Sequence, residues 1–407
     1  MNVFDELVGQ QHIVKSLQDA VTASRTGEET QEMTHAWLFT GPPGSGRSSA
    51  AVAFAAALIC PNDGCGTCID CRTAMAGGHA DVEVIRTEGL SIKIDEVREL
   101  LQRVAWSPSV GGWRVVVMED SDRLTESAAN AMLKAIEEPG TRTVWLLCAP
   151  TLHDVLPTIR SRCRHLQLRT PSTDAVAEVL TRRYDISPGM ADFAARVSQG
   201  HIGRARHLAT DESIRGRRNT IMKLPLTITD IASAFKAAAT LVELATEEAN
   251  TQSEARDEKE SQELAQAWGQ GATGRGMATG GSKALKELEK EQKSRATRMV
   301  RDSLDGALLD IATLYRDVMM VQATNATNGT QQTNSANSAG ATTQSAADCL
   351  TQSLINKELA GEIAALADRL PPHATVEKIN AIMKARTNLS FNAAPLLTIE
   401  ALMCALA

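Results

Sequence analysis

Aromatic side chains are scarce in this 407-residue chain, because Phe, Trp and Tyr together make up only 3% of it. The hydrophobic cores must therefore consist of Ala, Leu, Ile and Val, which favours helices with small-residue packing over all-β sandwiches. Excess positive charge is also lacking, since the formal net charge is -7, and a basic nucleic-acid footprint over the whole chain is excluded. No apolar run approaches the ~18 residues of a membrane span, and the N-terminus has no secretory pattern. We therefore expect a cytoplasmic protein.

The first 168 residues alternate apolar runs with helical patterns. At ~150 residues per domain, the chain length predicts two to three domains. Continuous β-branched runs are typical of strands buried on both faces of a parallel sheet. We therefore predict an α/β fold with a doubly wound parallel sheet over residues 1–168. The expected strands are residues 35–40, 81–86, 113–120 and 143–149, and the expected helices are residues 48–60, 91–106 and 127–139.

The sequence beyond residue 168 has the pattern of an all-helical protein. Helical patterns opened by Pro or Ser predict a small helical domain at 169–212, and amphipathic stretches at 228–248, 283–320 and 351–368 predict a helical domain at 215–407. Two segments interrupt this domain. Residues 269–281 are glycine-rich and are predicted to be flexible. Residues 322–347 are uncharged and polar, and we predict disorder because they cannot bury enough apolar surface to offset chain entropy.

A glycine-rich loop lies between the first predicted strand and the alanine-rich helix. Glycines let successive backbone N–H groups turn toward a phosphate, and the helix N-terminus adds its positive end. The loop fits the pattern G-x-x-x-x-G-K-[ST] except that Arg, with its wide planar fork, replaces Lys. The loop is a candidate site for ATP or ADP, and the Arg disfavours efficient hydrolysis; alternatively, the loop only shapes the fold. Its residues are Gly41, Pro42, Pro43, Gly44, Ser45, Gly46, Arg47 and Ser48.

Two acids, Glu119 and Asp120, end the strand predicted at 113–120. In a nucleoside triphosphatase, an Asp at this place supports Mg²⁺ and a following Glu positions water. Here the order is Glu then Asp, and a carboxylate misplaced by ~1 Å can lower a rate ~100-fold. The alternative interpretation is a pair of solvent-exposed acids at a strand end.

Four cysteines, Cys60, Cys65, Cys68 and Cys71, lie within twelve residues. The glycines between them permit tight turns, and four thiolates suit a tetrahedral Zn²⁺ with Zn–S distances near ~2.3 Å. Because four thiolates leave no coordination position open, we predict a structural zinc and disfavour a catalytic one. The alternative is a set of four buried or free thiols.

The motifs together resemble the AAA+ clamp-loader family of bacterial DNA polymerase III. The resemblance rests on the segment 3–17 with Val8-Gly9-Gln10, the phosphate loop, the four cysteines, the acidic motif with the AIEEP helix at 135–139, and Ser161-Arg162-Cys163. It implies an AAA+ core at 1–168 with a zinc module at 60–71, a helical lid at 169–212 and a helical collar at 215–407. It also implies that Arg162 acts in trans, on the ATP of a neighbouring subunit. Such arginine fingers are worth 10³–10⁵ in rate in other systems.

The implied partners are motor subunits of the tau or gamma type and a delta subunit in a five-membered ring, with the sliding clamp and primed DNA reached through the complex and no membrane involved. The sequence departs from the pattern of a motor subunit at four places: Arg47, the Glu119-Asp120 order, Cys148 after the fourth strand, and Gly203 in the predicted lid. We therefore predict a non-motor subunit that supplies an arginine finger. The alternatives are a motor ATPase of the same ring and an unrelated zinc-bearing AAA+ module.

Overall fold

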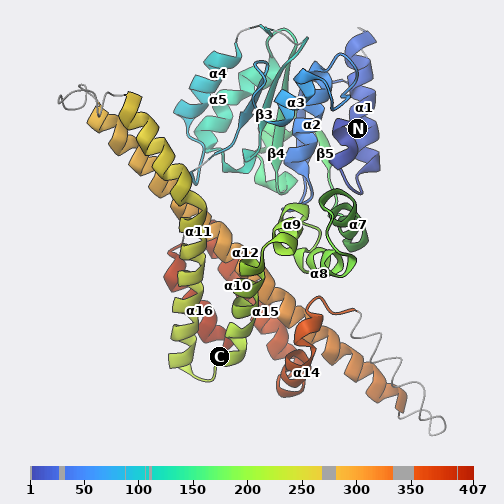
Figure 1. The fold of residues 1–407 in the computed structure, drawn as a ribbon, viewed down its shortest axis with the longest axis vertical. Coiled ribbons are helices and arrows are strands. Elements are labelled where there is room, and N and C mark those ends of the chain that lie inside the picture. The colour runs from blue at the N-terminus through green and yellow to red at the C-terminus, as the bar shows by residue number, and fades with distance from the viewer. Residues whose placement is uncertain are drawn as a thin grey trace. The chain divides into compact units, whose positions relative to one another are not determined.

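The computed structural model describes residues 2–26, 33–87, 89–105, 107–109, 112–267, 281–332, 353–391 and 393–407. The chain splits into two compact units, Met1–Thr210 and Asp211–Ala407, and each is described by itself (Figure 1). The predicted helical lid at 169–212 lies almost wholly in the first unit, together with the sheet, and its separation from the core stays a prediction. None of the described helices is long and apolar enough to cross a membrane.

The first unit is built on one parallel sheet of five strands in the order β2-β3-β4-β1-β5. The α/β prediction with a parallel sheet is therefore confirmed. The strands are β1 (Ala36–Thr40), β2 (Val82–Ile85), β3 (Arg114–Met118), β4 (Thr143–Ala149) and β5 (Arg164–Gln167). The four predicted strands match β1 to β4, whereas β5, the edge strand beside β1, is not predicted.

Helices cover both faces of the sheet (Figure 1). In β4, Leu146 and Cys148 pack in an apolar cluster with α1, α2 and α3, whereas Trp145 and Leu147 pack in a second cluster with α4 and α5. Successive strand side chains point to opposite faces, so one continuous apolar run serves two cores. The helices and 3₁₀ turns around the sheet are η1 (Val3–Glu6), α1 (Gln11–Thr26), α2 (Arg47–Ile59), α3 (Ile69–Met75), α4 (Ile94–Val104), η2 (Ser121–Arg123), α5 (Glu126–Glu137), η3 (Leu152–Asp154) and α6 (Pro157–Arg160).

Three short helices, α7 (Thr173–Tyr184), α8 (Pro188–Ser198) and α9 (Ile202–Thr210), complete the first unit. Ser172 caps α7 by accepting a hydrogen bond from the backbone N–H of Ala175, and a proline begins α8. Both are ordinary helix starts, because the first backbone N–H groups of a helix have no partner within it.

The second unit is helical. Its long helices α11 (Ile231–Ala267) and α12 (Gly281–Gln332) pack side by side, and α14 to α16 pack on them (Figure 1). Its core includes a buried polar cluster of three residues, in which Arg218 donates hydrogen bonds to Asp310 at 3.1 Å and to Asn356 at 2.5 Å. The other elements are α10 (Glu212–Lys223), η4 (Leu224–Thr227), η5 (Lys357–Leu359), α14 (Ala360–Arg369), α15 (Pro372–Ser390) and α16 (Pro395–Leu406).

Disorder was predicted for residues 322–347, whereas α12 includes residues 322–332 and ends at Gln332. The buried Gln322 side chain donates to the carbonyl oxygens of Ala367 at 3.3 Å and Leu370 at 2.7 Å. Extending a helix that is already packed needs no new nucleus, so the composition of the segment does not stop it. Residues 333–347 and the glycine-rich segment up to residue 280 lie outside the described residues.

Candidate functional site

The glycine-rich loop lies, as predicted, between β1 and α2. Gly44 and Gly46 have φ values of +85° and +86°, in the region that favours glycine. The loop thereby turns the N-terminal end of α2 toward a cleft, which Gly46, Arg47, Ser48 and Ser49 help to line. Helix N-termini present unpaired N–H groups and a positive dipole end, so this edge of the cleft is suited to an anion such as a phosphate.

The basic residue of the loop is engaged by the loop itself. Arg47 Nη1 donates a hydrogen bond of 2.8 Å to the carbonyl oxygen of Gly41. The buried Ser45 hydroxyl has no hydrogen-bond partner among the described residues, and a Cβ on Gly41 would lie only 2.4 Å from its oxygen. The hydrogen bond of Arg47 to Gly41 therefore stabilises the closed turn of the loop. The remaining donors of the guanidinium stay near the cleft, which Arg47 lines.

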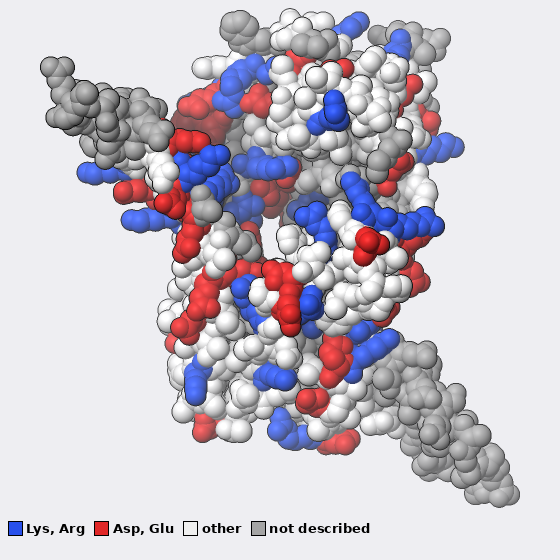
Figure 2. Space-filling model, in the orientation of Figure 1, with Lys and Arg blue, Asp and Glu red and all other residues white. Residues whose placement is uncertain are grey.

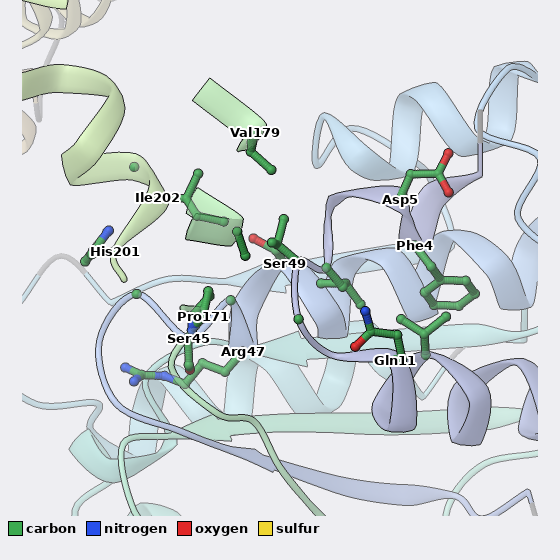
Figure 3. A pocket seen from close by; sticks show the side chains of 18 of the residues that line it. Phe4, Asp5, Gln11, Ser45, Arg47, Ser49, Pro171, Val179, His201 and Ile202 are labelled. Carbon is green, nitrogen blue, oxygen red and sulfur yellow. The ribbon is translucent and has the colours of Figure 1, made fainter. Parts of the chain in front are cut away.

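The cleft beside the loop has a volume of about 1280 Å³, above the ~300–1,000 Å³ of ordinary small-molecule pockets. Figure 3 shows His201 and Ile202 on one side of it, with Phe4 and Asp5 on the opposite side. The wall comes from three stretches of the first unit: the N-terminal turn with α1, the glycine-rich loop, and the helices α7 and α9. A cleft of this size between a phosphate-type loop and the helices α7 and α9 can hold a nucleotide.

Two contacts join the chain around α7 and α9 to the rest of the cleft wall. The buried Gln10 side chain donates to the carbonyl oxygen of Arg169 at 2.5 Å and accepts from its N–H at 3.2 Å. A Cβ on Gly44 would lie 2.5 Å from the Cβ of His201, so His201 packs directly on the loop. Burial lowers the pKa of His201, and the charges of Arg204 and Arg47 lower it further. The imidazole is therefore neutral at pH 7.

The acidic pair follows β3, as predicted, and an ion pair engages its first member. Arg86 Nε donates to Glu119 Oε1 at 2.9 Å, and neither Glu119 nor Asp120 is among the described residues that line the cleft. The sequence motifs did not single out a third acid near this strand end, Asp122. Burial raises its pKa, the charge of Asp120 raises it further, and its Oδ1 has no partner among the described residues. The sequence feature that points to Asp122 is the spacing of acids in Glu-Asp-Ser-Asp at residues 119–122.

The four cysteines converge between the end of α2 and α3. Their four Sγ atoms lie within 4.8 Å of one another, and Cys60 Sγ is 3.7 Å from the sulfurs of Cys65 and Cys68. Tetrahedral zinc with Zn–S bonds of ~2.3 Å requires sulfur–sulfur distances of about 3.8 Å. The donor set and its spacing therefore fit a structural zinc.

Backbone N–H groups support the same sulfurs. The amides of Cys65 and Cys68 donate to Cys60 Sγ and Cys65 Sγ, both at 3.4 Å. Hydrogen bonds from Thr67, the side chain first, lower the pKa of Cys65 to about 6, whereas burial raises that of Cys71. Donors of this kind orient thiolates and stabilise their charge, as outer partners of metal ligands do.

Arg162 lies directly after α6, and its side chain is half-exposed on the surface. Its Nε donates to Glu137 Oε1 at 2.5 Å, and its Nη1 donates to the carbonyl oxygen of Thr158 at 2.7 Å. Arg162 also forms an ion pair with Glu137 through Nη2. Arg162 is thus paired with an acid of its own chain, and a role in trans stays a prediction.

Charged side chains of both signs are mixed over the face shown in Figure 2. Within the described residues of that view, acids accompany the lysines and arginines. This distribution agrees with the negative net charge of the chain.

Residues 10–172 match the family model described as DNA polymerase III, delta subunit. The chain is 36% identical over 174 residues to DNA polymerase III subunit delta' of Pseudomonas aeruginosa, covering 41% of this chain and 53% of that protein. It is 30% identical over 200 residues to the delta' subunit of Escherichia coli K12, covering 48% of this chain and 60% of that protein. It is also 30% identical over 215 residues to subunit tau of Bacillus subtilis, covering 50% of this chain and 37% of that protein. The chain thus spans between 37% and 60% of the length of these relatives.

Among solved structures, the chain is similar to a gamma subunit-related protein of Thermotoga maritima, with 18% identity, 71% of this chain and 99% of that chain covered, and a TM-score of 0.33. At this score the likeness adds nothing to the sequence matches. Residues 10–172 are therefore similar to clamp-loader subunits of DNA polymerase III, and relatives of the delta' and tau types match at comparable identity.

Proposed function

We propose that this chain is a non-motor, delta'-type subunit of the DNA polymerase III clamp loader. In this role it joins motor subunits of the tau or gamma type and a delta subunit in a ring, and the complex loads the sliding clamp onto primed DNA. The chain carries a structural zinc, hydrolyses little ATP itself and supplies Arg162 to the ATP site of a neighbour. The similarity of residues 10–172 to delta' and tau subunits supports the clamp-loader part of this proposal.

The single observation that carries the non-motor assignment is the hydrogen bond of 2.8 Å from Arg47 to Gly41. A hydrolysing phosphate loop needs its cation at the β- and γ-phosphates. Here the guanidinium binds a backbone carbonyl of the same loop, and its planar fork does not replace a compact ammonium. The ion pair of Glu119 with Arg86 supports the same conclusion, because an acid paired in this way is not free to position a water molecule.

The proposed role of Arg162 is supported by its place on the surface and by its partners. The side chain is 37% exposed, and its partner Glu137 is 45% exposed. Exposed pairs of this kind contribute little, about 0–1 kcal/mol. An incoming triphosphate, with several negative charges and oxygen acceptors, offers the guanidinium a stronger bidentate partner.

Assembly and ATP turnover test the proposal together. The purified chain should co-elute with a DNA polymerase III tau or gamma subunit and a delta subunit in gel filtration. Alone, it should release phosphate from ATP no faster than the Arg47→Ala variant, which is the matched control for contaminating ATPases. Failure to co-elute would reject the clamp-loader role.

The alternative motor function is favoured by the match to the tau subunit of Bacillus subtilis. It requires turnover by the isolated chain near the typical enzyme value of ~10 s⁻¹, and loss of that turnover in the Arg47→Ala variant. That result would replace the non-motor assignment and leave the clamp-loader role intact.

A further inference from the structure

The loop between the first two cysteines contacts the N-terminal turn η1. The N–H of Val3 donates to the carbonyl oxygen of Gly64 at 2.9 Å. Gly64 has a φ of +83°, and a Cβ at this position would lie 2.6 Å from Val3 Cγ2. The loop and η1 therefore approach each other as closely as a glycine allows.

Arg25, near the end of α1, holds the same loop from a second direction. Its Nε forms an ion pair with Asp63 at 2.7 Å, its Nη1 donates to the carbonyl oxygen of Pro61 at 3.0 Å, and its Nη2 donates to that of Cys60. Asp63 has a φ of +52°, a conformation that a residue other than glycine adopts only when its surroundings favour it. One guanidinium thus fixes three successive parts of the cysteine loop.

The N-terminal turn is also part of the cleft. Phe4, Asp5 and Leu7 line it, and Figure 3 shows Phe4 and Asp5 on the side opposite His201. Phe4 and Leu7 are themselves buried. The short turn η1 is capped reciprocally, because the Asn2 side chain accepts from the N–H of Phe4 at 3.0 Å and the N–H of Asn2 donates to Asp5 Oδ2 at 2.7 Å. A turn of four residues has little stability of its own, so its position depends on what it packs against.

We propose that the cysteine module, residues 60–71, positions the N-terminal wall of the cleft, with Arg25 as the positioning residue that holds the loop to α1. Bound zinc would fix the two ends of the loop through the thiolates of Cys60 and Cys65. Arg25 holds the loop to α1, and the Val3–Gly64 hydrogen bond holds η1 to the loop. Metal binding and the shape of the cleft are therefore linked, and this gives the module a function beyond local stability.

Hydrogen exchange of the zinc-loaded full chain tests this linkage directly. Removing zinc with a chelator under reducing conditions should accelerate amide exchange in residues 3–10 by about tenfold or more, which corresponds to the loss of about one charge-assisted hydrogen bond. Exchange in β4 should not change, because that strand is buried in the centre of the sheet. Equal exchange in residues 3–10 with and without metal would overturn the proposal. Loss of protection in β4 as well would also overturn it, since zinc would then hold the whole unit.

Variants of Arg25 separate positioning from general stability. Arg25→Met should raise exchange in residues 3–10 about tenfold with metal bound, and Arg25→Lys should restore protection only in part, because one ammonium cannot reach three acceptors. Arg98→Met is the matched control, since Arg98 is an exposed helical arginine paired with Asp95 at 3.5 Å. An equal effect of Arg98→Met would refute the role of Arg25.

Cobalt substitution provides a readout at the metal. Arg25→Met should keep the tetrathiolate charge-transfer band at saturating Co²⁺ but need severalfold more cobalt to reach it. Gly64→Ala should raise exchange in residues 3–10 while retaining the band, because the clash is with Val3 and not with a sulfur. Unchanged cobalt titration in Arg25→Met together with unchanged exchange would exclude the linkage. None of these measurements uses ATP hydrolysis or a partner subunit, so their failure is distinct from failure of the proposed function.

Discussion

Arg162→Ala is the change that separates an arginine finger from a local surface pair. In the structure Arg162 donates to Glu137 at 2.5 Å and to the carbonyl oxygen of Thr158 at 2.7 Å. If the residue acts in trans, it must leave Glu137 when a neighbour's triphosphate is in place. The two roles therefore predict different consequences for removing the arginine and for removing its acidic partner.

The magnitudes decide between these roles. A half-exposed pair is worth at most about 1 kcal/mol, whereas a finger that contributes 10³–10⁵ in rate lowers the barrier by about 4–7 kcal/mol. Releasing Arg162 from Glu137 therefore changes a rate by no more than about fivefold. We expect Arg162→Ala to lower hydrolysis at the bordering motor site by about 10³ or more, and Glu137→Gln to leave it unchanged or raise it slightly.

The assay is single-turnover ATP hydrolysis by a reconstituted loader in which the other motor sites are inactive. Arg162→Lys should rescue poorly, because it returns the charge without the planar fork, and Arg160→Ala, at the end of the adjacent helix α6, serves as the matched control. Thermal unfolding and zinc content of Arg162→Ala should equal those of the wild type. Full hydrolysis with Arg162→Ala would refute the finger. Equal losses in Arg162→Ala and Glu137→Gln would show that the local pair matters instead.

Three further predictions concern the metal, the phosphate loop and the lid contact. Protein prepared without chelators should contain about one zinc per chain by elemental analysis, and Cys68→Ser should lower both zinc content and thermal stability; metal-free wild type would contradict this. The isolated chain should turn over ATP far below ~10 s⁻¹, and Arg47→Ala should barely change clamp loading by the assembled complex; a strong loss would indicate that this loop acts catalytically. Because burial and the charges of Arg204 and Arg47 lower the pKa of His201 from 6.5, the unfolded chain binds more protons below pH 6.5. The free energy of unfolding should therefore fall below that pH, by up to about 1.4 kcal/mol per pH unit. Urea unfolding at pH 5.5 and 7.5 should show a smaller difference in His201→Gln, and an identical difference would exclude this residue as the cause.

The sheet was predictable wherever its strands are buried on both faces. In β3 and β4 nearly every side chain contributes to one of two apolar clusters, so the sequence reads as a continuous apolar run. The edge strand β5 is different, since its sequence is Arg-His-Leu-Gln and only Leu166 is buried. Its position is set by pairing with β1, a long-range interaction that a local pattern does not record.

Site residues that are close in sequence could be predicted to act together. Contacts that depend on a side-chain rotamer or on distant parts of the chain could not. The cysteines lie within twelve residues, and short turns suffice to bring their sulfurs together. The hydrogen bond of Arg47 to Gly41 depends on a rotamer, and the packing of His201 on Gly44 joins residues about 160 positions apart. Composition alone also predicts no helix at Gln322, where α12 continues and the side chain donates to the carbonyl oxygens of Ala367 and Leu370.

The surroundings of the two arginines differ in a way that fits a subunit acting on its neighbour. Arg47 lies beside the cleft of its own chain, donates to the loop carbonyl of Gly41, and has a buried Nε without a described partner. Moving Arg47 Nη1 onto a phosphate would break its hydrogen bond to the loop. Arg162 has only Glu137 and nearby surface groups as partners, and leaving them is opposed by little more than a solvent-screened pair. The cation that would serve the chain's own nucleotide is thus committed to the fold, while the cation that would serve another subunit can be released at low free energy.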